Sequence, residues 1–235
     1  MKMVSLDTTA IIQARMGSSR LPGKVLMKIE DKPILERIVY SLSRIIDLQD
    51  IYIATTTLKE DDPIEEFARN RGVNFYRGEV ENVFSRFANI ARIDNVKNNI
   101  ARFTGDNPFI DIEFVEFCFK KSMDYSRLGS NFIYSSRFTN VPTGLGIEIF
   151  SKNLLSMDCS ILNKYDLEHV TSWMYLDAKI HSIEFDDSEF RFSEKPSLTV
   201  DTAEDFQRAV SYAKWLGDKP VTLNSVVYWW QNLAK

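Results

Sequence analysis

The 235-residue sequence has little cysteine, no long hydrophobic run and no excess of basic charge. Its two cysteines, Cys118 and Cys159, are too few and too far apart for a metal-ligand motif or a disulfide framework, which favours a reducing compartment. No segment approaches the roughly 20 consecutive apolar residues of a membrane-spanning helix. Because the N-terminal residues also lack the apolar run and cleavage site of a signal peptide, we expect a cytoplasmic protein without a membrane partner.

The charge balance argues against a nucleic-acid partner. The 29 basic and 33 acidic residues are interspersed and give a net charge of −4, with no basic face for a polyanion. Hydrophobic residues at 44% and charged residues at 26% are typical of globular proteins. The length suits one domain over residues 1–235, with 131–150 as a candidate dimerisation or acceptor insertion and 217–235 as a helical C-terminal tail.

Apolar periodicity alternates between strand and helix along the first half of the chain. Strands are predicted at 8–14, 51–54, 73–76 and 100–104, and helices at 33–46, 62–71, 80–93 and 111–123. Further strands are predicted at 132–135, 147–150 and 180–185, and further helices at 151–157, 166–177, 202–216 and 222–234. Such alternation predicts an α/β fold with a mostly parallel, Rossmann-like sheet, helices on both faces and a small β insertion.

The loop at residues 13–24 follows the first strand and combines two glycines, two serines and three cations. Glycine allows backbone N–H groups to approach an anion closely, and Arg15, Arg20 and Lys24 can neutralise it, so the loop suits a polyphosphate. The spacing excludes a Walker loop, because five residues separate Gly17 from Gly23 and valine follows the lysine. The competing interpretation is a solvated turn with chance charges.

Two carboxylates follow predicted strands in the same way. Asp106 comes after the strand at 100–104, and Asp201 follows the apolar residues Leu198–Val200. Carboxylates at strand ends that face a polyphosphate are the ligands Mg²⁺ requires. Asp201 could instead cap the helix that starts near Thr202 or lie one residue before its cap.

The other reactive side chains have simpler interpretations on composition alone. A lone histidine on a helix, such as His169, is more often a surface or core residue than a catalyst. Cys118 lies among aromatic and apolar residues and is interpreted as a small buried hydrophobe. The aromatic tail around Trp229 is interpreted as core or interface packing.

The segment at 11–26, Ile-Ile-Gln-Ala-Arg-Met-Gly-Ser-Ser-Arg-Leu-Pro-Gly-Lys-Val-Leu, closely resembles the opening of the spore-coat-polysaccharide type of cytidylyltransferase-like proteins. These belong with the acylneuraminate and 3-deoxy-octulosonate cytidylyltransferases. The resemblance spans about residues 8–210 and continues through the segments at 54–57, 60–64, 77–78, 82–86, 104–108, 168–171 and 198–202. It implies the nucleotide-diphospho-sugar transferase type of the predicted fold.

The resemblance also implies a function: a Mg²⁺-dependent homodimer that transfers CMP from CTP to a sugar acid, releases pyrophosphate and serves the synthesis of surface polysaccharides or glycans. It assigns nucleotide binding to Ala14, Arg15, Gly17, Ser18, Ser19, Arg20, Lys24, Thr55, Thr56, Arg77 and Arg86. It assigns the metal to Asp106 and Asp201, the acceptor to Glu148, Glu168 and His169, and catalysis to Arg15, Lys24 and Asp106.

One departure and two alternatives leave the function partly open. Many relatives carry an acidic residue where this chain has Gly146, so the identity of the acceptor is not fixed by the resemblance. A glycosyltransferase that uses a nucleotide sugar is one alternative, although the sequence lacks an Asp-x-Asp metal motif. The second alternative is a non-catalytic nucleotide-binding module, and the choice of CTP over other triphosphates rests on loop geometry.

Overall fold

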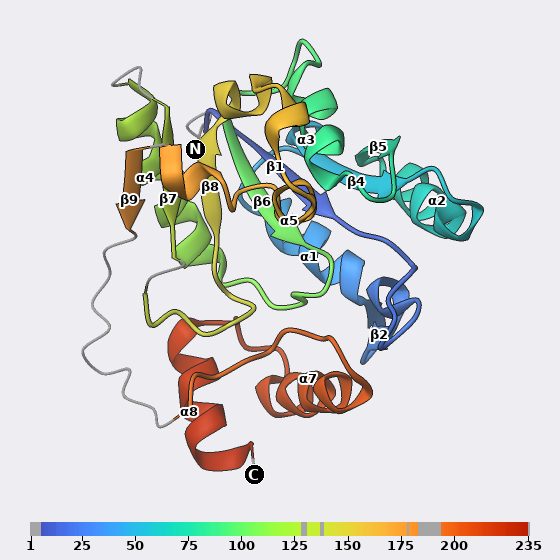
Figure 1. The fold of residues 1–235 in the computed structure, drawn as a ribbon. Coiled ribbons are helices and arrows are strands. Elements are labelled where there is room, and N and C mark those ends of the chain that lie inside the picture. Colours follow the sequence, from blue (N-terminus) through green and yellow to red (C-terminus); the bar gives the residue numbers. More distant parts are fainter. Residues whose placement is uncertain (1–5, 128–130, 137–138, 178, 183–193, 235) are drawn as a thin grey trace.

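A seven-stranded sheet forms the centre of the protein (Figure 1). The structure is a computed structural model that describes residues 6–127, 131–136, 139–177, 179–182 and 194–234. The sheet order is β5-β4-β1-β6-β8-β7-β9, and only β8 runs antiparallel to its neighbours. The strands are β1 (Thr8–Gln13), β4 (Ile51–Thr56), β5 (Asn74–Gly78), β6 (Asn99–Thr104), β7 (Phe132–Ser135), β8 (Glu148–Ser151) and β9 (Lys179–Ser182). A separate hairpin pairs β2 (Lys28–Ile29) with β3 (Lys32–Pro33).

Helices cover both faces of this sheet, because residues of the central strands alternate between two apolar cores. Ala10 and Ile12 of β1 face one core, whereas Ile11 between them faces the other. The first core holds α1 (Ile34–Leu42), α2 (Asp62–Arg71), α4 (Ile112–Arg127), α7 (Ala203–Leu216) and α8 (Leu223–Leu233). The second holds α3 (Val83–Ala91) and residues of or beside α5 (Lys164–His169) and α6 (Met174–Asp177).

The predicted α/β architecture is confirmed, and one helix follows its prediction from end to end. Helix α2 starts at Asp62 with proline in its first turn, and it ends before Gly72, whose φ of +65° is the left-handed conformation that glycine adopts without strain. By contrast, the helix predicted at 166–177 is two short helices, α5 and α6, separated by a turn at Val170. The strand predicted at 180–185 appears as β9, and its last residues lie outside the described part of the chain.

The two regions expected to form an insertion and a tail are both part of the main body. Strands β7 and β8, from the segment 131–150, extend the central sheet beyond β6. Helix α8 begins at the capping residue Thr222 and buries Val226, Val227 and Trp229 against the first core. Because these apolar surfaces pack within the chain, the expected homodimer stays a prediction.

No helix among the described residues is long and apolar enough to cross a membrane.

Candidate functional site

Two adjoining pockets open at the carboxyl end of the sheet, where β1 and β6 lie side by side. The chain places β4 and β5 on one side of β1 and then returns to place β6 on the other, so this is the switch point at which doubly wound sheets bind ligands. One pocket, the loop crevice, is lined by residues of the loop at 13–24 together with Asp106 and Asp201, and its volume is about 410 Å³. The other, the side pocket, is lined by residues 102–104 and 141–148 among others, and its volume is about 360 Å³. Thr104 and His169 line both, so the two pockets meet at these residues.

The loop that follows β1 is held in shape by the start of α2. The backbone N–H of Met16 donates to Asp61 Oδ1 at 2.6 Å, and Asp61 is fully buried. At Gly17 a Cβ would lie 2.6 Å from Glu60 Oε1, so a larger residue there would displace the Glu60 side chain. Gly23, with φ of +71°, closes the loop by donating its N–H to Met16 O at 2.8 Å. The loop therefore presents its polar side chains to the crevice from a fixed backbone.

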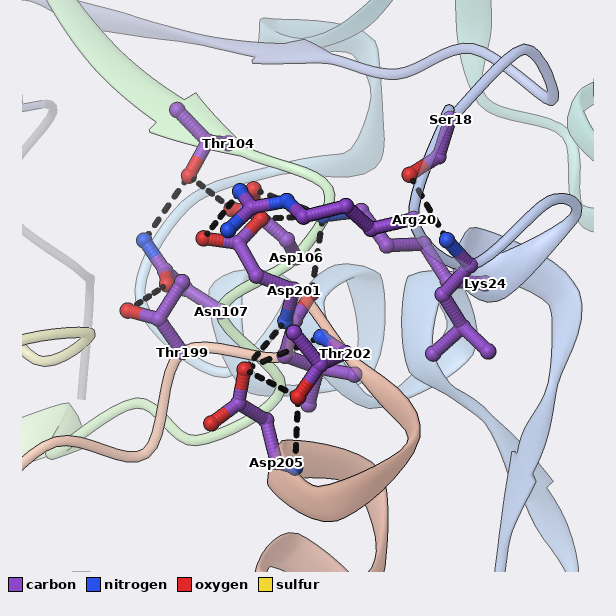
Figure 2. A network of polar contacts seen from close by, with 12 residues as sticks. Ser18, Arg20, Lys24, Thr104, Asp106, Asn107, Thr199, Asp201, Thr202 and Asp205 are labelled. Carbon is purple, nitrogen blue, oxygen red and sulfur yellow. Dashed lines mark hydrogen bonds and ion pairs between the residues drawn. The ribbon is translucent and has the colours of Figure 1, made fainter.

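Lys24 links the loop to the two predicted carboxylates (Figure 2). Its Nζ donates to Asp106 Oδ2 at 3.2 Å, to Asp201 Oδ1 at 2.8 Å and to the Val200 carbonyl at 2.8 Å. The side chain of Lys24 is only 10% exposed, which strengthens these charge-assisted bonds relative to a surface pair. Arg20 pairs with the other oxygen of Asp201 at 3.0 Å.

The carboxylates of Asp106 and Asp201 fit a divalent cation. Asp106 Oδ2 and Asp201 Oδ1 both lie within hydrogen-bond distance of the Lys24 ammonium group, so these two oxygens can also face one metal ion. Thr104 Oγ1 donates to Asp106 Oδ1 and orients it. The described residues contain no group of three or more His, Cys, Asp or Glu side chains that could hold a metal. Two carboxylates completed by phosphate oxygens and water are the usual protein environment of Mg²⁺.

A buried arginine adds positive charge to the back of the loop crevice. Arg86 of α3 lines the crevice but is only 2% exposed. Within the described part of the chain its Nε has no hydrogen-bond partner, and its Nη1 reaches only the Ala54 carbonyl at 3.5 Å. Burial, and to a lesser extent the nearby charge of Arg15, lower the pKa of Arg86 to about 10, while Asp61 opposes them. An anion bound in the crevice would relieve this unfavourable environment.

The side pocket combines an apolar floor with one polar wall. Its floor includes the buried residues Phe103, Phe109, Ile110, Val115, Val141, Leu145 and Ile147. Its wall includes Glu148, which accepts hydrogen bonds from Arg102 at 2.7 Å and Thr171 at 3.0 Å on Oε2, and from Tyr175 at 2.6 Å on Oε1. Lys195 also lines the pocket, where its Nζ donates to the Thr139 carbonyl at 3.1 Å.

Gly146 lines the side pocket and has no room for a side chain. A Cβ there would lie 2.6 Å from Ser136 Oγ. That hydroxyl accepts from Ile147 N at 2.9 Å, so it is not free to move aside. A larger residue at this position would therefore clash with Ser136.

The structure brings most of the predicted site residues together and leaves four outside. Of the predicted site residues, those that line the loop crevice are Ala14, Arg15, Ser18, Ser19, Arg20, Lys24, Arg86, Asp106, Glu168, His169 and Asp201. Gly17, Thr55, Thr56 and Arg77 are not among its lining residues. Glu148 lines only the side pocket.

Of the four residues predicted near the base and ribose, Arg86 lines the loop crevice, whereas Arg77, Thr55 and Thr56 lie elsewhere. Arg77 donates to the carbonyls of Thr56 and Leu58 at 2.7 Å each, and it pairs with Asp62 at 2.8 Å and with Glu65 at 2.7 Å. Thr55 and Thr56 are fully buried, and the Thr56 hydroxyl donates to Asp61. Thr56 and Arg77 thus connect β4 and β5 to the start of α2. The assignment of Thr55, Thr56 and Arg77 to nucleotide binding stays a prediction.

Sequence reasoning missed Arg102 and Asn107, which line the side pocket, and Thr199, which supports Asn107. Arg102 occupies the middle of β6, and its Nε donates to Gln13 Oε1 at 3.0 Å. Asn107 and Thr199 are bonded to each other at 2.9 Å and support the segment before Asp201 (Figure 2). The one sequence signal that Arg102 has a role was its charge between the apolar residues Ala101 and Phe103. A buried charge of this kind needs an oppositely charged or hydrogen-bonding partner.

Comparisons with known proteins agree on one family. The sequence profile of the cytidylyltransferases matches residues 9–228. The spore coat polysaccharide biosynthesis protein SpsF of Bacillus subtilis is 33% identical over 91% of this chain and 89% of its own length. A 3-deoxy-manno-octulosonate cytidylyltransferase of Hydrogenovibrio crunogenus is 32% identical over 47% of this chain and 45% of its own length.

A solved structure extends this similarity to the fold. A cytidylyltransferase from Leptospira borgpetersenii superposes with a TM-score of 0.84 and is 27% identical in sequence. The match covers 96% of this chain and 94% of that one.

Proposed function

Because this chain belongs to the cytidylyltransferase family, we propose that it transfers CMP from CTP to a sugar acid and releases pyrophosphate. One observation carries the proposal: a loop with three cations faces Asp106 and Asp201 across a crevice that adjoins a second pocket. A nucleotidyl transfer needs this arrangement, since one site must hold the triphosphate while another presents the acceptor.

The triphosphate is assigned to the loop crevice. Arg15, Arg20 and Lys24 supply positive charge, and the hydroxyls of Ser18 and Ser19 line the same wall. Arg86 behind them is desolvated and lacks a full set of partners, which favours an anion over water in this position. In a partly enclosed crevice these cations stabilise charge that develops on phosphate oxygens more strongly than they would in open water.

A magnesium ion is assigned to Asp106 and Asp201, where its charge would neutralise the phosphate oxygens of the bound triphosphate. Lys24 holds both carboxylates in one orientation before any ligand arrives. The Asp205 carboxylate accepts from Asp201 N at 3.1 Å and fixes the backbone of that residue (Figure 2). The site is thus preorganised by the chain itself.

The acceptor is assigned to the side pocket. Arg102 in this pocket is paired with Glu148, and Lys195 supplies a further positive charge that suits a carboxylate. The hydroxyls of Ser135 and Thr143 suit a sugar. The names of the octulosonate enzyme and of the spore coat protein support a sugar acid that enters a polysaccharide. His169 stands where the two substrates would meet, and Glu168 before it lines the loop crevice.

The reaction is an in-line displacement at the α-phosphorus. A hydroxyl oxygen of the acceptor forms the new P–O bond, the bond to the bridging oxygen of pyrophosphate breaks, and the hydroxyl loses its proton. His169 is the titratable side chain that lines both pockets, and we assign it to receive this proton or to orient the hydroxyl. The rest of the catalysis is positioning and charge neutralisation.

The proposal is tested by a pyrophosphate-release assay with Mg²⁺, CTP and a panel of sugar acids, with products identified by mass. Release of pyrophosphate together with a CMP-sugar is the expected result. Release of a nucleoside diphosphate from a nucleotide sugar would instead indicate a glycosyltransferase. CTP binding without turnover on any acceptor would indicate a non-catalytic module.

A further inference from the structure

The turn that follows His169 has an unusual backbone. Val170 has φ of 60° and ψ of −53°, a region that β-branched residues rarely adopt. The N–H of Thr171 donates to the His169 carbonyl across it, so the three residues form a γ-turn of the rare positive-φ type. This turn stops α5 at His169 and separates it from α6, where the sequence predicts one continuous helix.

A strained turn of this kind persists only where its surroundings determine it, and two interactions do so here. The side chain of Val170 is fully buried in the second core. The hydroxyl of Thr171, itself only 2% exposed, donates to Glu148 Oε2 at 3.0 Å. Glu148 is fixed in turn by Arg102 of β6 and by Tyr175 of α6.

The turn determines where the His169 side chain lies. The residues before the turn belong to α5, which is capped by Asn163. One of them, Glu168, also contacts Arg15 at 3.9 Å. The imidazole packs against the Tyr165 ring, with centroids 4.2 Å apart, and lines both pockets. His169 is the last residue of α5, so the turn fixes where the chain leaves the helix directly after this side chain.

We propose that Thr171 and Glu148 are positioning residues that hold His169 at the junction of the two pockets. This inference rests on the proposed function, because it assigns these residues to acceptor use. Glu148 acts in this proposal through Thr171, and both of its oxygens are held by hydrogen bonds from the chain. The bond between the Thr171 hydroxyl and the Glu148 carboxylate thus fixes the turn directly after the histidine.

A comparison of Thr171→Val with Thr171→Ser separates the effect of the Thr171 hydroxyl from the effect of the shape of its side chain. Valine keeps the volume and removes the donor, whereas serine keeps the donor. In the pyrophosphate-release assay, we expect Thr171→Val to raise the KM for the sugar acid about 10-fold, because a hydrogen bond to a charged group is lost. The KM for CTP should stay within about 2-fold, and Thr171→Ser should behave like the wild type.

Thr57→Val is the matched control, since Thr57 is exposed on the loop after β4 and lines neither pocket. Equal rises in both KM values, or the same kinetics for Thr171→Val as for the control, would overturn the proposal. Glu148→Gln removes the carboxylate charge at nearly constant shape, and it replaces Thr171→Val if that variant does not fold.

Proton NMR tests the positioning without any substrate. The chain has two histidines, His169 and His181, and a His169→Gln spectrum assigns their ring resonances. The Tyr165 ring shifts the His169 resonances, so Thr171→Val should move them while Thr171→Ser and Thr57→Val leave them in place. If no acceptor gives turnover, the proposed function fails, and unmoved His169 resonances in Thr171→Val would separately overturn the positioning role.

Discussion

At the scale of single residues, Lys24 offsets the repulsion between the carboxylates of Asp106 and Asp201 in the loop crevice. Asp106 and Asp201 approach the same point, and two carboxylates in a partly buried site repel one another. The Lys24 ammonium donates to both and also to the Val200 carbonyl, so all three of its hydrogens are used. The lysine thus assembles the site and leaves the carboxylates facing a position where further positive charge is favourable.

Lys24→Met should therefore lower kcat/KM by about 10²–10³-fold, the usual cost of removing one group that stabilises developing charge. Binding of Mn²⁺ in the absence of nucleotide should become tighter, because the competing ammonium is gone. Steady-state kinetics and electron paramagnetic resonance of Mn²⁺ measure the two effects. Lys28→Met, at an exposed position of β2, is the control. Turnover at the wild-type rate in Lys24→Met would exclude the assigned role.

Arg86 should show a conflict between stability and function. Its guanidinium is buried with few partners and lies near Arg15, so it is unfavourable in the free protein. Arg86→Met should raise the free energy of unfolding by about 1 kcal/mol or more, and it should weaken CTP binding about 10-fold or more. Urea unfolding and calorimetric titration measure these changes. Arg92→Met, on the exposed end of the same helix, should change neither. A less stable variant with unchanged CTP affinity would contradict this account.

At the scale of elements, the start of α7 supports Asp201. Thr202 caps the helix, and Asp205 accepts from the backbone N–H groups of both Asp201 and Thr202. Burial alone would raise the pKa of Asp205, but hydrogen bonds from Thr202, Asp201 and Arg208 outweigh it and hold the pKa below its usual value. The sequence left open whether Asp201 caps this helix, and the structure shows that Thr202 does.

The depressed pKa of Asp205 gives a pH dependence with a defined sign. The ionised carboxylate stabilises the folded protein, so its contribution is complete above its usual pKa and is lost as pH falls through the lower folded value. Asp205→Ala should lower the free energy of unfolding by about 0.5–2 kcal/mol at neutral pH. The difference from wild type should shrink in strong acid. Urea titrations at several pH values measure it, with Asp218→Ala at an exposed position as control. A difference that grows with acidity would contradict the sign.

Local signals explain which elements could be predicted. Helix α2 has a proline in its first turn and a glycine after its last residue, so both of its ends are encoded nearby. The break after His169 has no such signal, because valine rarely adopts a positive φ and the turn depends on Glu148 from a distant strand. Tertiary contacts override helical periodicity there.

At the scale of the whole molecule, strand order decides which predicted residues form the site. The sequence predicts that every parallel strand ends at the same edge, but it does not show which strands are neighbours. Because β1 and β6 pair at the switch point, the ends of these two strands meet, and Gly105 lies against Ala14. Strands β4 and β5 extend the sheet on the other side of β1, so Thr55, Thr56 and Arg77 lie outside the crevice.

The C-terminal segment completes the site from the far end of the chain. Val200 N donates to the Asp106 carbonyl at 2.8 Å, which places Asp201 beside Asp106. Figure 1 shows α7 and α8 below the sheet, and Leu223 at the start of α8 donates to Asp111 Oδ2 at 2.8 Å near the start of α4. Assembly of the two carboxylates is therefore a property of the complete fold.

The central claim is that the loop crevice binds CTP with Mg²⁺, and thermal unfolding tests it most directly. The protein is heated with Mg²⁺ and, in separate samples, CTP, UTP, ATP or GTP. A ligand at about 100 times its Kd stabilises the native state by about 2.7 kcal/mol, which gives a clear rise in Tm. We predict a rise with CTP alone among the four and none in Lys24→Met. An equal response to all four nucleotides, or none, would contradict the account.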